Sequence, residues 1–331
     1  MSDYRDGRLV TIFGGSGFLG RHLTRALAKR GWRVRAAVRR PDLAFHLQPL
    51  GGVGQVTAVQ ANLRYPDSVA AAARGSDAIV NLVGVLVPSG RQTFDAVQAF
   101  GAQAVARAAA QAGVENVVHV SAIGADAASD SGYARSKGEG EAAVRAARPG
   151  AVILRPSVVF GPEDQFFNRF AALARFMPAL PLVGETTRLQ PVFVGDVAEA
   201  AARALEGGAK PGTTYELGGP EVMTMREIFD YVLKVTERRR ALIPVPDAGA
   251  RLIAAITETA DRLTLGLMPD ELVTTRDQVK LLGRDNVVSE AAKAEGRTLE
   301  GLGLRPTLVE AIVPTYLWRY RKTGQFDRAK A

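Results

Sequence analysis

The sequence predicts an α/β protein with a doubly wound parallel sheet and a smaller, mostly helical C-terminal domain. Three observations support this prediction. Short β-branched runs alternate with segments of helical apolar spacing from residue 9 to residue 155. A glycine-rich turn separates the first predicted strand from the first predicted helix. A length of 331 residues suits one large domain or two coupled domains, at roughly 150 residues per domain.

The first half of the chain repeats one unit of strand followed by helix. We expect strands at 9–13, 34–38, 56–59, 78–83, 116–121 and 151–155, and helices at 19–30, 66–74, 93–112 and 134–147. This rhythm implies right-handed crossovers and a parallel sheet covered on both faces.

The pattern loosens after residue 156. We place a first domain at 1–160 and a second at 161–331, with 190–219 returning to the sheet of the first. A capping box from Thr224 to Glu227 predicts a helix at about 225–236. A second helix is expected at 248–264, and its apolar side is expected to be core; its residues are Leu252, Ile253, Ile256 and Leu263.

Cysteine and histidine usage excludes several kinds of chemistry. The chain has no cysteine, which excludes disulfide scaffolds, thiolate nucleophiles and cysteine-ligated clusters. Its three histidines, His22, His46 and His119, are far apart in the sequence. We therefore expect no metal site, and we expect each histidine to be structural or on the surface.

The charge balance is positive but diffuse. Lys and Arg number 42 against 34 Asp and Glu, a formal net charge of +8. The arginines are scattered, so we expect no nucleic-acid partner. No run reaches the roughly 18 apolar residues of a membrane-spanning helix. The N-terminus lacks the basic and apolar regions of a secretory signal, so we expect the chain to stay on the cytoplasmic side.

The glycine cluster at 14–20 predicts a dinucleotide site. It satisfies both Gly14-x-x-Gly17-x-x-Gly20 and Gly15-x-Gly17-x-x-Gly20, between a predicted strand and a predicted helix. Glycines there permit a tight turn, close approach of backbone N–H groups to a pyrophosphate, and close packing of helix on strand. We expect a bound nicotinamide dinucleotide.

The residues at the end of the second predicted strand indicate whether NAD or NADP(H) binds. Enzymes that use NAD usually place a carboxylate there for the ribose 2′-hydroxyl. This chain has Arg39 and Arg40 instead, which could bind a 2′-phosphate, so NADP(H), with NADPH as the bound form, is favoured. The alternative is that both are solvated loop arginines. Further contacts are expected from Asn62-Leu63 after the third strand. The run Asn81-Leu82-Val83-Gly84 ends the fourth strand beside the nucleotide, with contacts expected from Val83 and Gly84.

An acid–base pair is predicted on the helix at 134–147 and just before it. Tyr133 and Lys137 are four residues apart, so they share one helix face, and the ammonium is expected to lower the pKa of the phenol. Ser121 ends the fifth strand, at the sheet edge where ligands of such folds bind.

These motifs together resemble the extended and atypical short-chain dehydrogenase/reductases, a Rossmann-fold family, across about 220 residues. Arg155-Pro156-Ser157 with Gly161-Pro162, and the run 193–198, contribute to the resemblance. It implies that Tyr133 is the catalytic acid/base, that Lys137 binds the nicotinamide ribose, and that Ser121 hydrogen-bonds a substrate carbonyl. The residues expected to contact the nucleotide are Gly14, Gly15, Ser16, Gly17, Phe18, Leu19, Gly20, Arg39, Arg40, Asn62, Leu63, Val83, Gly84, Ser121, Tyr133, Lys137, Arg155 and Pro156.

One departure bears on turnover. In the helix at 93–112, the active family commonly has an Asn three residues before a Gly, where it completes a proton relay. Here Gln98 precedes Gly101. A longer amide would misplace the relay water, so we expect nucleotide binding with doubtful catalysis.

Three other segments resemble the dehydrogenase-like accessory subunits of respiratory complex I, in their alphaproteobacterial form. They are 119–126, 281–289 and 316–321. The resemblance implies a tightly held, structural NADPH and a peripheral place on the cytoplasmic face of the inner membrane, against hydrophilic-arm and membrane-interface subunits.

Two other functions stay open: a free-standing NADP-dependent reductase or nucleotide-sugar epimerase/dehydratase, and an NADP(H) sensor that binds a transcription factor. The C-terminal cluster of aromatic and basic side chains suits a lipid headgroup boundary or a protein groove; it consists of Trp318, Arg319, Arg321, Lys322, Phe326, Arg328 and Lys330.

Overall fold

The computed structural model describes residues 7–88, 90, 92–263 and 275–322. The chain forms two compact units. Unit 1 comprises Met1–Pro156, Val194–Leu217 and Val288–Arg305, and unit 2 comprises Ser157–Phe193, Gly218–Val287 and Pro306–Ala331. Each unit is described by itself.

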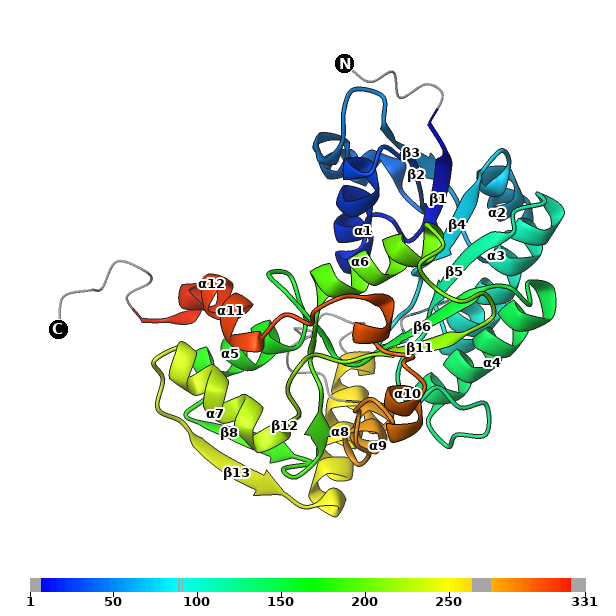
Figure 1. Ribbon diagram of the computed structural model, residues 1–331. Helices are drawn as coiled ribbons and strands as arrows, with labels where there is room; N and C mark the ends of the chain where they lie inside the picture. Colours follow the sequence, from blue (N-terminus) through cyan, green and yellow to red (C-terminus); the bar gives the residue numbers. More distant parts are fainter. Residues whose placement is uncertain (1–6, 89, 91, 264–274, 323–331) are drawn as a thin grey trace. The chain divides into compact units, whose positions relative to one another are not determined.

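A seven-stranded sheet forms the centre of unit 1 (Figure 1). Its order is β11-β6-β5-β4-β1-β2-β3, and every neighbouring pair is parallel. The strands are β1 (Leu9–Phe13), β2 (Arg33–Val38), β3 (Val56–Gln60), β4 (Ala78–Asn81), β5 (Asn116–Val120), β6 (Val152–Pro156) and β11 (Thr214–Leu217). The predicted doubly wound parallel sheet is confirmed, and its strand order reverses direction between β1 and β4.

Helices cover both faces of this sheet (Figure 1). Helices α1 (Phe18–Lys29) and α6 (Val194–Leu205) pack together on one face, and α2 (Pro66–Ala73), α3 (Phe100–Gln111) and α4 (Gly132–Ala147) lie on the other. The predicted helix at 93–112 begins with a π-helical turn, Asp95–Ala99, before α3. Two short 3₁₀ segments, Pro41–Leu43 and Phe45–Leu50, follow β2.

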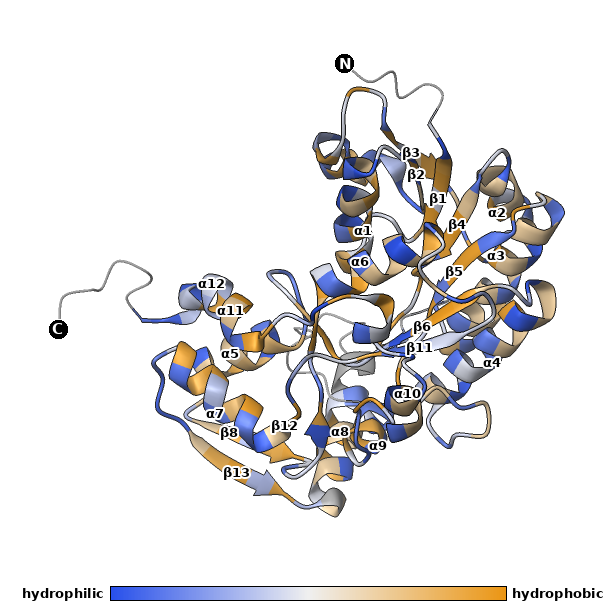
Figure 2. Cartoon of the chain, viewed as in Figure 1, coloured by the Kyte–Doolittle hydropathy of each residue, from blue (hydrophilic) through white to orange (hydrophobic). Residues whose placement is uncertain are grey.

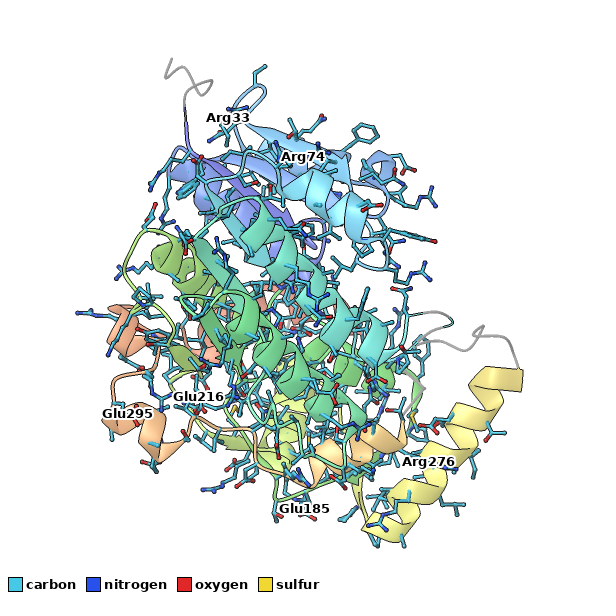
Figure 3. All side chains as sticks on the ribbon, turned by 90° about the vertical axis from the view of Figure 1, so that its right-hand side faces the viewer. Arg33, Arg74, Glu185, Glu216, Arg276 and Glu295 are labelled. Atoms are coloured by element: carbon cyan, nitrogen blue, oxygen red, sulfur yellow. The ribbon has the colours of Figure 1, made fainter. Side chains whose placement is uncertain are left out.

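Residues 288–305 also belong to unit 1. They carry α10 (Glu290–Ala294) and a 3₁₀ turn, Glu300–Leu302. Two hydrogen bonds join this segment to Glu216 of β11. The Glu216 carboxylate accepts from the Ser289 N–H at 2.7 Å, and the Glu216 N–H donates to the Arg297 carbonyl at 2.9 Å. Figure 3 labels Glu216 on β11 and Glu295 in the returning segment.

Unit 2 is built from short strand pairs and helices. Strands β7 (Val159–Phe160) and β10 (Val192–Phe193) pair parallel, as do β8 (Ala179–Val183) and β13 (Ala241–Val245), while β9 (Arg188–Leu189) and β12 (Met223–Thr224) pair antiparallel. The helices are α5 (Phe167–Phe176), α7 (Met225–Val235), α8 (Asp247–Leu263), α9 (Arg276–Leu282), α11 (Val309–Ile312) and α12 (Pro314–Leu317). The capping box predicted at Thr224 is confirmed at the start of α7.

The apolar side of α8 is not core, contrary to the prediction. Leu252 is 62% exposed and Ile256 59%, and Ile253 is also exposed. Ala250 and Ala254 are the α8 residues that are buried against Val279. Small side chains, rather than the leucine and the isoleucines, therefore form the packed face of α8. The Leu263 side chain lies outside the described residues.

Part of the predicted C-terminal docking segment is folded into unit 2. Tyr316 and Leu317 are buried in its core, and the 3₁₀ turn Trp318–Tyr320 follows. Arg319 donates to the Asn168 side chain at 2.5 Å. Phe326, Arg328 and Lys330 lie outside the described residues. Within the described chain, no helix has both the length and the apolar character to cross a membrane.

Candidate nucleotide site and catalytic set

The predicted site residues of unit 1 lie mainly at the carboxyl ends of its parallel strands. Gly14 follows β1, Val83 follows β4 and Ser121 follows β5. In open α/β sheets, ligands bind at this edge, beside the point where the strand order reverses. Here that point lies between β1 and β4.

The glycine loop can be built only from glycine at its critical positions. Gly14 has φ +84°, in the left-handed region. A Cβ at Gly20 would lie 2.4 Å from the Gly14 carbonyl oxygen and 2.5 Å from that of Gly15. A Cβ at Gly15 would lie 2.8 Å from the Ala36 Cβ on β2. The loop is therefore pressed between β2 and the first turn of α1.

The N-terminus of α1 is suited to an anion. Its N-cap is Gly17, which provides no side-chain cap, and the first turn, with Phe18, Leu19 and Gly20, contains no acidic residue. Free N–H groups at a helix start, together with the helix dipole, favour a phosphate. The cradle fits the pyrophosphate of a dinucleotide, with Ser16 and Gly17 in the turn that leads into the helix.

The two arginines after β2 differ in their contacts. Both are exposed. The Arg40 guanidinium pairs with Asp42 at 2.8 Å, which raises the pKa of Arg40 and lowers that of Asp42. Arg39 has no side-chain partner among the described residues. Arg39 is therefore the freer of the two for a 2′-phosphate.

Asn62 and Leu63 follow β3, and both are engaged within unit 1. The Asn62 Oδ1 accepts from the Arg64 N–H at 3.2 Å. Leu63 is buried in the core beside α3, where a Cβ on Gly101 would meet its Cδ1 at 2.7 Å. Leu63 therefore contributes packing, and any nucleotide contact at this position falls to its backbone or to Asn62.

The loop after β4 connects the glycine turn to helix α4. A Cβ at Gly14 would lie 3.2 Å from the Val83 side chain, and a Cβ at Gly84 would lie 3.2 Å from the Lys137 Nζ. Lys137 also donates to the Val120 carbonyl at 3.3 Å, one residue before Ser121. The structure therefore brings the ends of β4 and β5 and the lysine of α4 together.

Burial sets the protonation of the Tyr133–Lys137 pair. It lowers the pKa of Lys137 to about 8, which Glu141 partly opposes. It raises the pKa of Tyr133 to about 12, so the predicted lowering of the phenol pKa is wrong for this structure. The Lys137 Nζ is 6.0 Å from the Tyr133 ring centroid. At neutral pH Tyr133 is thus a protonated phenol beside a largely charged ammonium.

Ser121 is buried, and its hydroxyl oxygen has no hydrogen-bond partner among the described residues. Buried hydroxyls in proteins are normally satisfied, so an unsatisfied one at a ligand-binding edge calls for an external partner. A substrate carbonyl or a nucleotide amide would provide it.

His119 is a buried polar group that the sequence did not single out for the site. It is 2% exposed and lies opposite Asn81 in the ladder of β4 and β5. Asn81 Oδ1 accepts from the Val83 N–H, so its amide nitrogen faces the His119 Nδ1, at 3.2 Å. The proton of His119 is then on Nε2, which has no partner among the described residues. Burial and the Lys137 charge lower the pKa of His119 to about 3.

Gln98 is fully engaged by protein groups. It lies in the π-helical turn, and its amide nitrogen donates to the Val85 carbonyl at 2.6 Å. Its amide oxygen accepts from the Ser136 hydroxyl at 2.8 Å. Ser136 is the residue before Lys137, so Gln98 links the loop after β4 to helix α4. The π-helical turn, a feature frequent at functional sites, places the longer amide there.

Arg155 and Pro156 end β6. Arg155 forms a two-pronged pair with Glu141 of α4, at 2.8 and 2.7 Å, which raises the pKa of the guanidinium. Arg155 therefore holds α4 against the sheet, and Pro156 is buried beside it. Among the described residues, no group of three or more His, Asp or Glu side chains could hold a metal ion.

Sequence reasoning found the glycine loop, Ser121, Tyr133 and Lys137, but not the polar side chains behind them. These are His119, Ser136 and Glu141. One of them carried a usable signal: a polar residue inside an otherwise apolar strand, as His119 is in Val-Val-His-Val, indicates a buried hydrogen-bonding role.

Known proteins resemble this chain over most of its length. The model of the NAD dependent epimerase/dehydratase family matches residues 10–218. The mouse (Mus musculus) protein named NADH dehydrogenase (ubiquinone) 1 alpha subcomplex subunit 9, mitochondrial, is 34% identical over 95% of this chain and 81% of its own length. The ceramide reductase of Caulobacter vibrioides is 34% identical over 96% of this chain and 95% of its own length.

A solved structure shares the fold. The NADPH-dependent quinone oxidoreductase QOR2 of Escherichia coli, complexed with NADPH, superposes with a TM-score of 0.68, at 19% identity, over 93% of this chain and 99% of its own. These matches confirm the predicted resemblance to the dehydrogenase/reductase family.

Proposed function

Because the chain belongs to the NAD dependent epimerase/dehydratase family, we propose that it is an NADP(H)-binding accessory subunit of a respiratory NADH:ubiquinone oxidoreductase. The observation that supports this most is the 34% identity to the mouse subunit over 95% of the chain. In this proposal the subunit lies peripherally on the cytoplasmic face of the inner membrane, against hydrophilic-arm and membrane-interface subunits.

A tagged chain tests the association. After solubilisation in a mild detergent, we expect the tagged chain to comigrate with NADH:ubiquinone reductase activity on a native gel. Emergence of the chain alone, with the oxidoreductase intact elsewhere on the gel, would contradict the proposal.

We propose NADPH as the bound nucleotide, with its 2′-phosphate at Arg39. Arg39 has no competing partner among the described residues, whereas Arg40 is held by Asp42. An Arg39→Gln variant should bind NADPH about 10-fold to 100-fold more weakly, the range for a lost charge-assisted bond, with NADH affinity unchanged. Arg40→Gln is the matched control and should lose less. Nucleotide released by denaturing the purified protein identifies the form.

The C-terminal tail is proposed to touch lipid headgroups. A truncation after Lys322 is the suitable test, because removal from residue 316 would also delete Tyr316 and Leu317 from the core of unit 2. The truncated chain should keep its nucleotide and bind membranes more weakly than the full chain.

A second function, a free-standing reductase, is favoured by an independent observation. Ser121, Tyr133 and Lys137 are all present at one sheet edge, and the similarity to the ceramide reductase extends over 95% of that protein. The substrate would be a lipid carbonyl compound. When bound, the nucleotide would supply the hydride to the carbonyl carbon.

In that function each residue has a defined role. The unpartnered Ser121 hydroxyl donates to the substrate carbonyl oxygen. Tyr133 is protonated at neutral pH, which is the form that delivers a proton to that oxygen as it becomes an alcohol. Lys137 remains largely charged and stabilises the phenolate that proton transfer leaves behind.

A Tyr133→Phe variant distinguishes the two functions. In an accessory subunit it should complement deletion of the gene as fully as the wild type, because the nucleotide stays bound. In a reductase it should abolish complementation and lower turnover by at least about 100-fold. Tyr65→Phe, at an exposed tyrosine that follows Arg64, is the control and should be neutral in both cases.

A further inference from the structure

We propose that one edge of unit 2 is a docking surface for a bilayer of anionic phospholipid. We name it the basic edge and define it by Arg175, Phe176, Arg238, Arg239, Arg240 and Arg321. This inference does not depend on either proposed function, since all six residues lie in unit 2, away in sequence from the catalytic set.

Strand register brings these residues together. Strands β8 and β13 are parallel, with Ala179 beside Ala241. The residues just before β13, Arg238–Arg240, therefore lie next to those just before β8, which include Arg175 and Phe176 at the end of α5. Figure 2 shows the connection from α7 to β13 as hydrophilic.

Three of the arginines donate hydrogen bonds to backbone carbonyls at the ends of helices. Arg240 Nε donates to the Ala174 carbonyl of α5 at 2.9 Å, and Arg321 Nε donates to the Val235 carbonyl of α7 at 2.9 Å. Arg238 Nε donates to the Tyr320 carbonyl at 2.8 Å. Cations are favourable at helix C-termini, where carbonyls lack partners. These three have an architectural role and are fixed in place by it.

Arg175 and Arg239 have no such role. Both are exposed, and neither has an acidic partner among the described residues. The acidic side chain that takes part in this edge is Glu237, which pairs with Arg321 at 3.0 Å. Burial and the neighbouring charges of Arg240 and Arg175 lower the pKa of Arg238, which shows that these cations repel one another. The edge carries an excess of positive charge that an anionic partner would neutralise.

Apolar side chains lie among the charges. Phe176 is 77% exposed, and its ring centroid is 5.3 Å from the Arg175 guanidinium carbon. Ile243 on β13 is 53% exposed. An acidic protein would neutralise the arginines. It would leave the Phe176 and Ile243 side chains in water, unless it also offered an apolar pocket that fits them. A phospholipid surface offers phosphates for the guanidiniums and an acyl boundary for the phenyl ring.

Vesicle sedimentation tests the proposal with the full chain. Vesicles of phosphatidylcholine with 30% phosphatidylglycerol should bind the protein, vesicles of phosphatidylcholine alone should bind it far less, and 0.5 M salt should release it. The Arg175→Gln/Arg239→Gln double variant should bind about 30-fold more weakly, at a few-fold to tenfold for each basic residue near the surface. Phe176→Ser should weaken binding several-fold at low salt.

Arg107→Gln provides the matched control, since Arg107 is an exposed arginine of α3 in unit 1. It should bind like the wild type. Thermal unfolding shows that each variant is folded. The proposal is overturned if the wild type ignores anionic vesicles, if the double variant binds as the control does, or if both vesicle types bind equally. An acidic protein captured through these arginines without vesicle binding would overturn it as well.

Discussion

Two buried polar clusters, one in each unit, differ in how completely their groups are hydrogen-bonded. In unit 2, the carboxylate of Asp164 accepts from the backbone N–H groups of Gly161, Phe166 and Asn168 and from the Tyr316 hydroxyl at 2.6 Å. In unit 1, the Ser121 hydroxyl and the His119 Nε2 are buried with no partner among the described residues.

This contrast separates architecture from function. A fully satisfied buried carboxylate fixes a loop and leaves no capacity for a ligand. Unsatisfied buried donors cost stability, and such groups persist where a ligand or a reaction uses them. The Ser121 hydroxyl and the His119 Nε2 both lie at or near the end of β5, beside Lys137, which is where a ligand would be expected.

The largest predicted effect is at the glycine loop of unit 1. In Gly20→Ala, the new Cβ would meet two carbonyl oxygens at 2.4 and 2.5 Å, and backbone atoms cannot move away without opening the loop. We expect the free energy of unfolding to fall by about 3 kcal/mol or more, with loss of nucleotide. Gly17→Ala, whose nearest such contact is 3.3 Å, should cost less than about 1 kcal/mol. Urea unfolding and nucleotide content measure both, and equal effects would refute the steric argument.

The next effect is the acid sensitivity that His119 confers on unit 1. Its pKa is near 3 when folded and about 6.5 when unfolded, so between these values only the unfolded state binds the proton. Stability is therefore fully present above pH 6.5 and is lost as the pH falls toward 3, by up to about 1.4 kcal/mol per pH unit.

His119→Gln should flatten this slope. The measurement is the free energy of unfolding in urea at pH 7.5, 5.5 and 4.5, for the wild type and the variant. His46→Gln, at an exposed histidine, is the control and should keep the wild-type slope. A variant with an unchanged acid slope would show that His119 does not stay neutral in the folded protein.

Sequence reasoning predicted unit 1 better than unit 2 for a physical reason. The central strands of the large sheet, such as β1 and β4, are short, buried runs next to their own turns and helices, so local periodicity suffices. Unit 2 is assembled from two-residue strands paired across long separations, such as Arg188–Leu189 with Met223–Thr224. A strand of two residues shows no periodicity from which it could be predicted.

Within the site, too, local patterns could be predicted from the sequence, whereas contacts between distant residues could not. The glycine loop and the Tyr133–Lys137 spacing are local patterns, so they could be read directly. The Asn81–His119 and Gln98–Ser136 contacts join residues 38 positions apart in each case, through strand pairing and helix packing. The raised pKa of Tyr133 could not be predicted either, because spacing shows the neighbouring charge and not the degree of burial.

A matched pair of variants tests the contrast between satisfied and orphaned groups. Tyr316→Phe in unit 2 removes a buried bond to the Asp164 carboxylate, so the free energy of unfolding should fall by about 2 kcal/mol. Ser121→Ala in unit 1 removes no bond within the protein, so stability should change by less than about 0.5 kcal/mol. A large loss at Ser121 would mean that its hydroxyl is satisfied in the folded protein and would weaken the case for a ligand there.

A last pair of variants, one in each unit, has equal expected stability losses and differs in its expected effect on nucleotide release. Gln98→Asn shortens an amide that spans Val85 and Ser136, so one of its two bonds is lost, at about 1 kcal/mol. Thr224→Ala removes the cap of α7 in unit 2, also at about 1 kcal/mol. Because Gln98 ties the Gly84 loop to the helix of Lys137, only Gln98→Asn should speed the release of bound nucleotide, by several-fold in a stopped-flow exchange measurement. Equal release rates in the two variants would show that Gln98 contributes to stability alone.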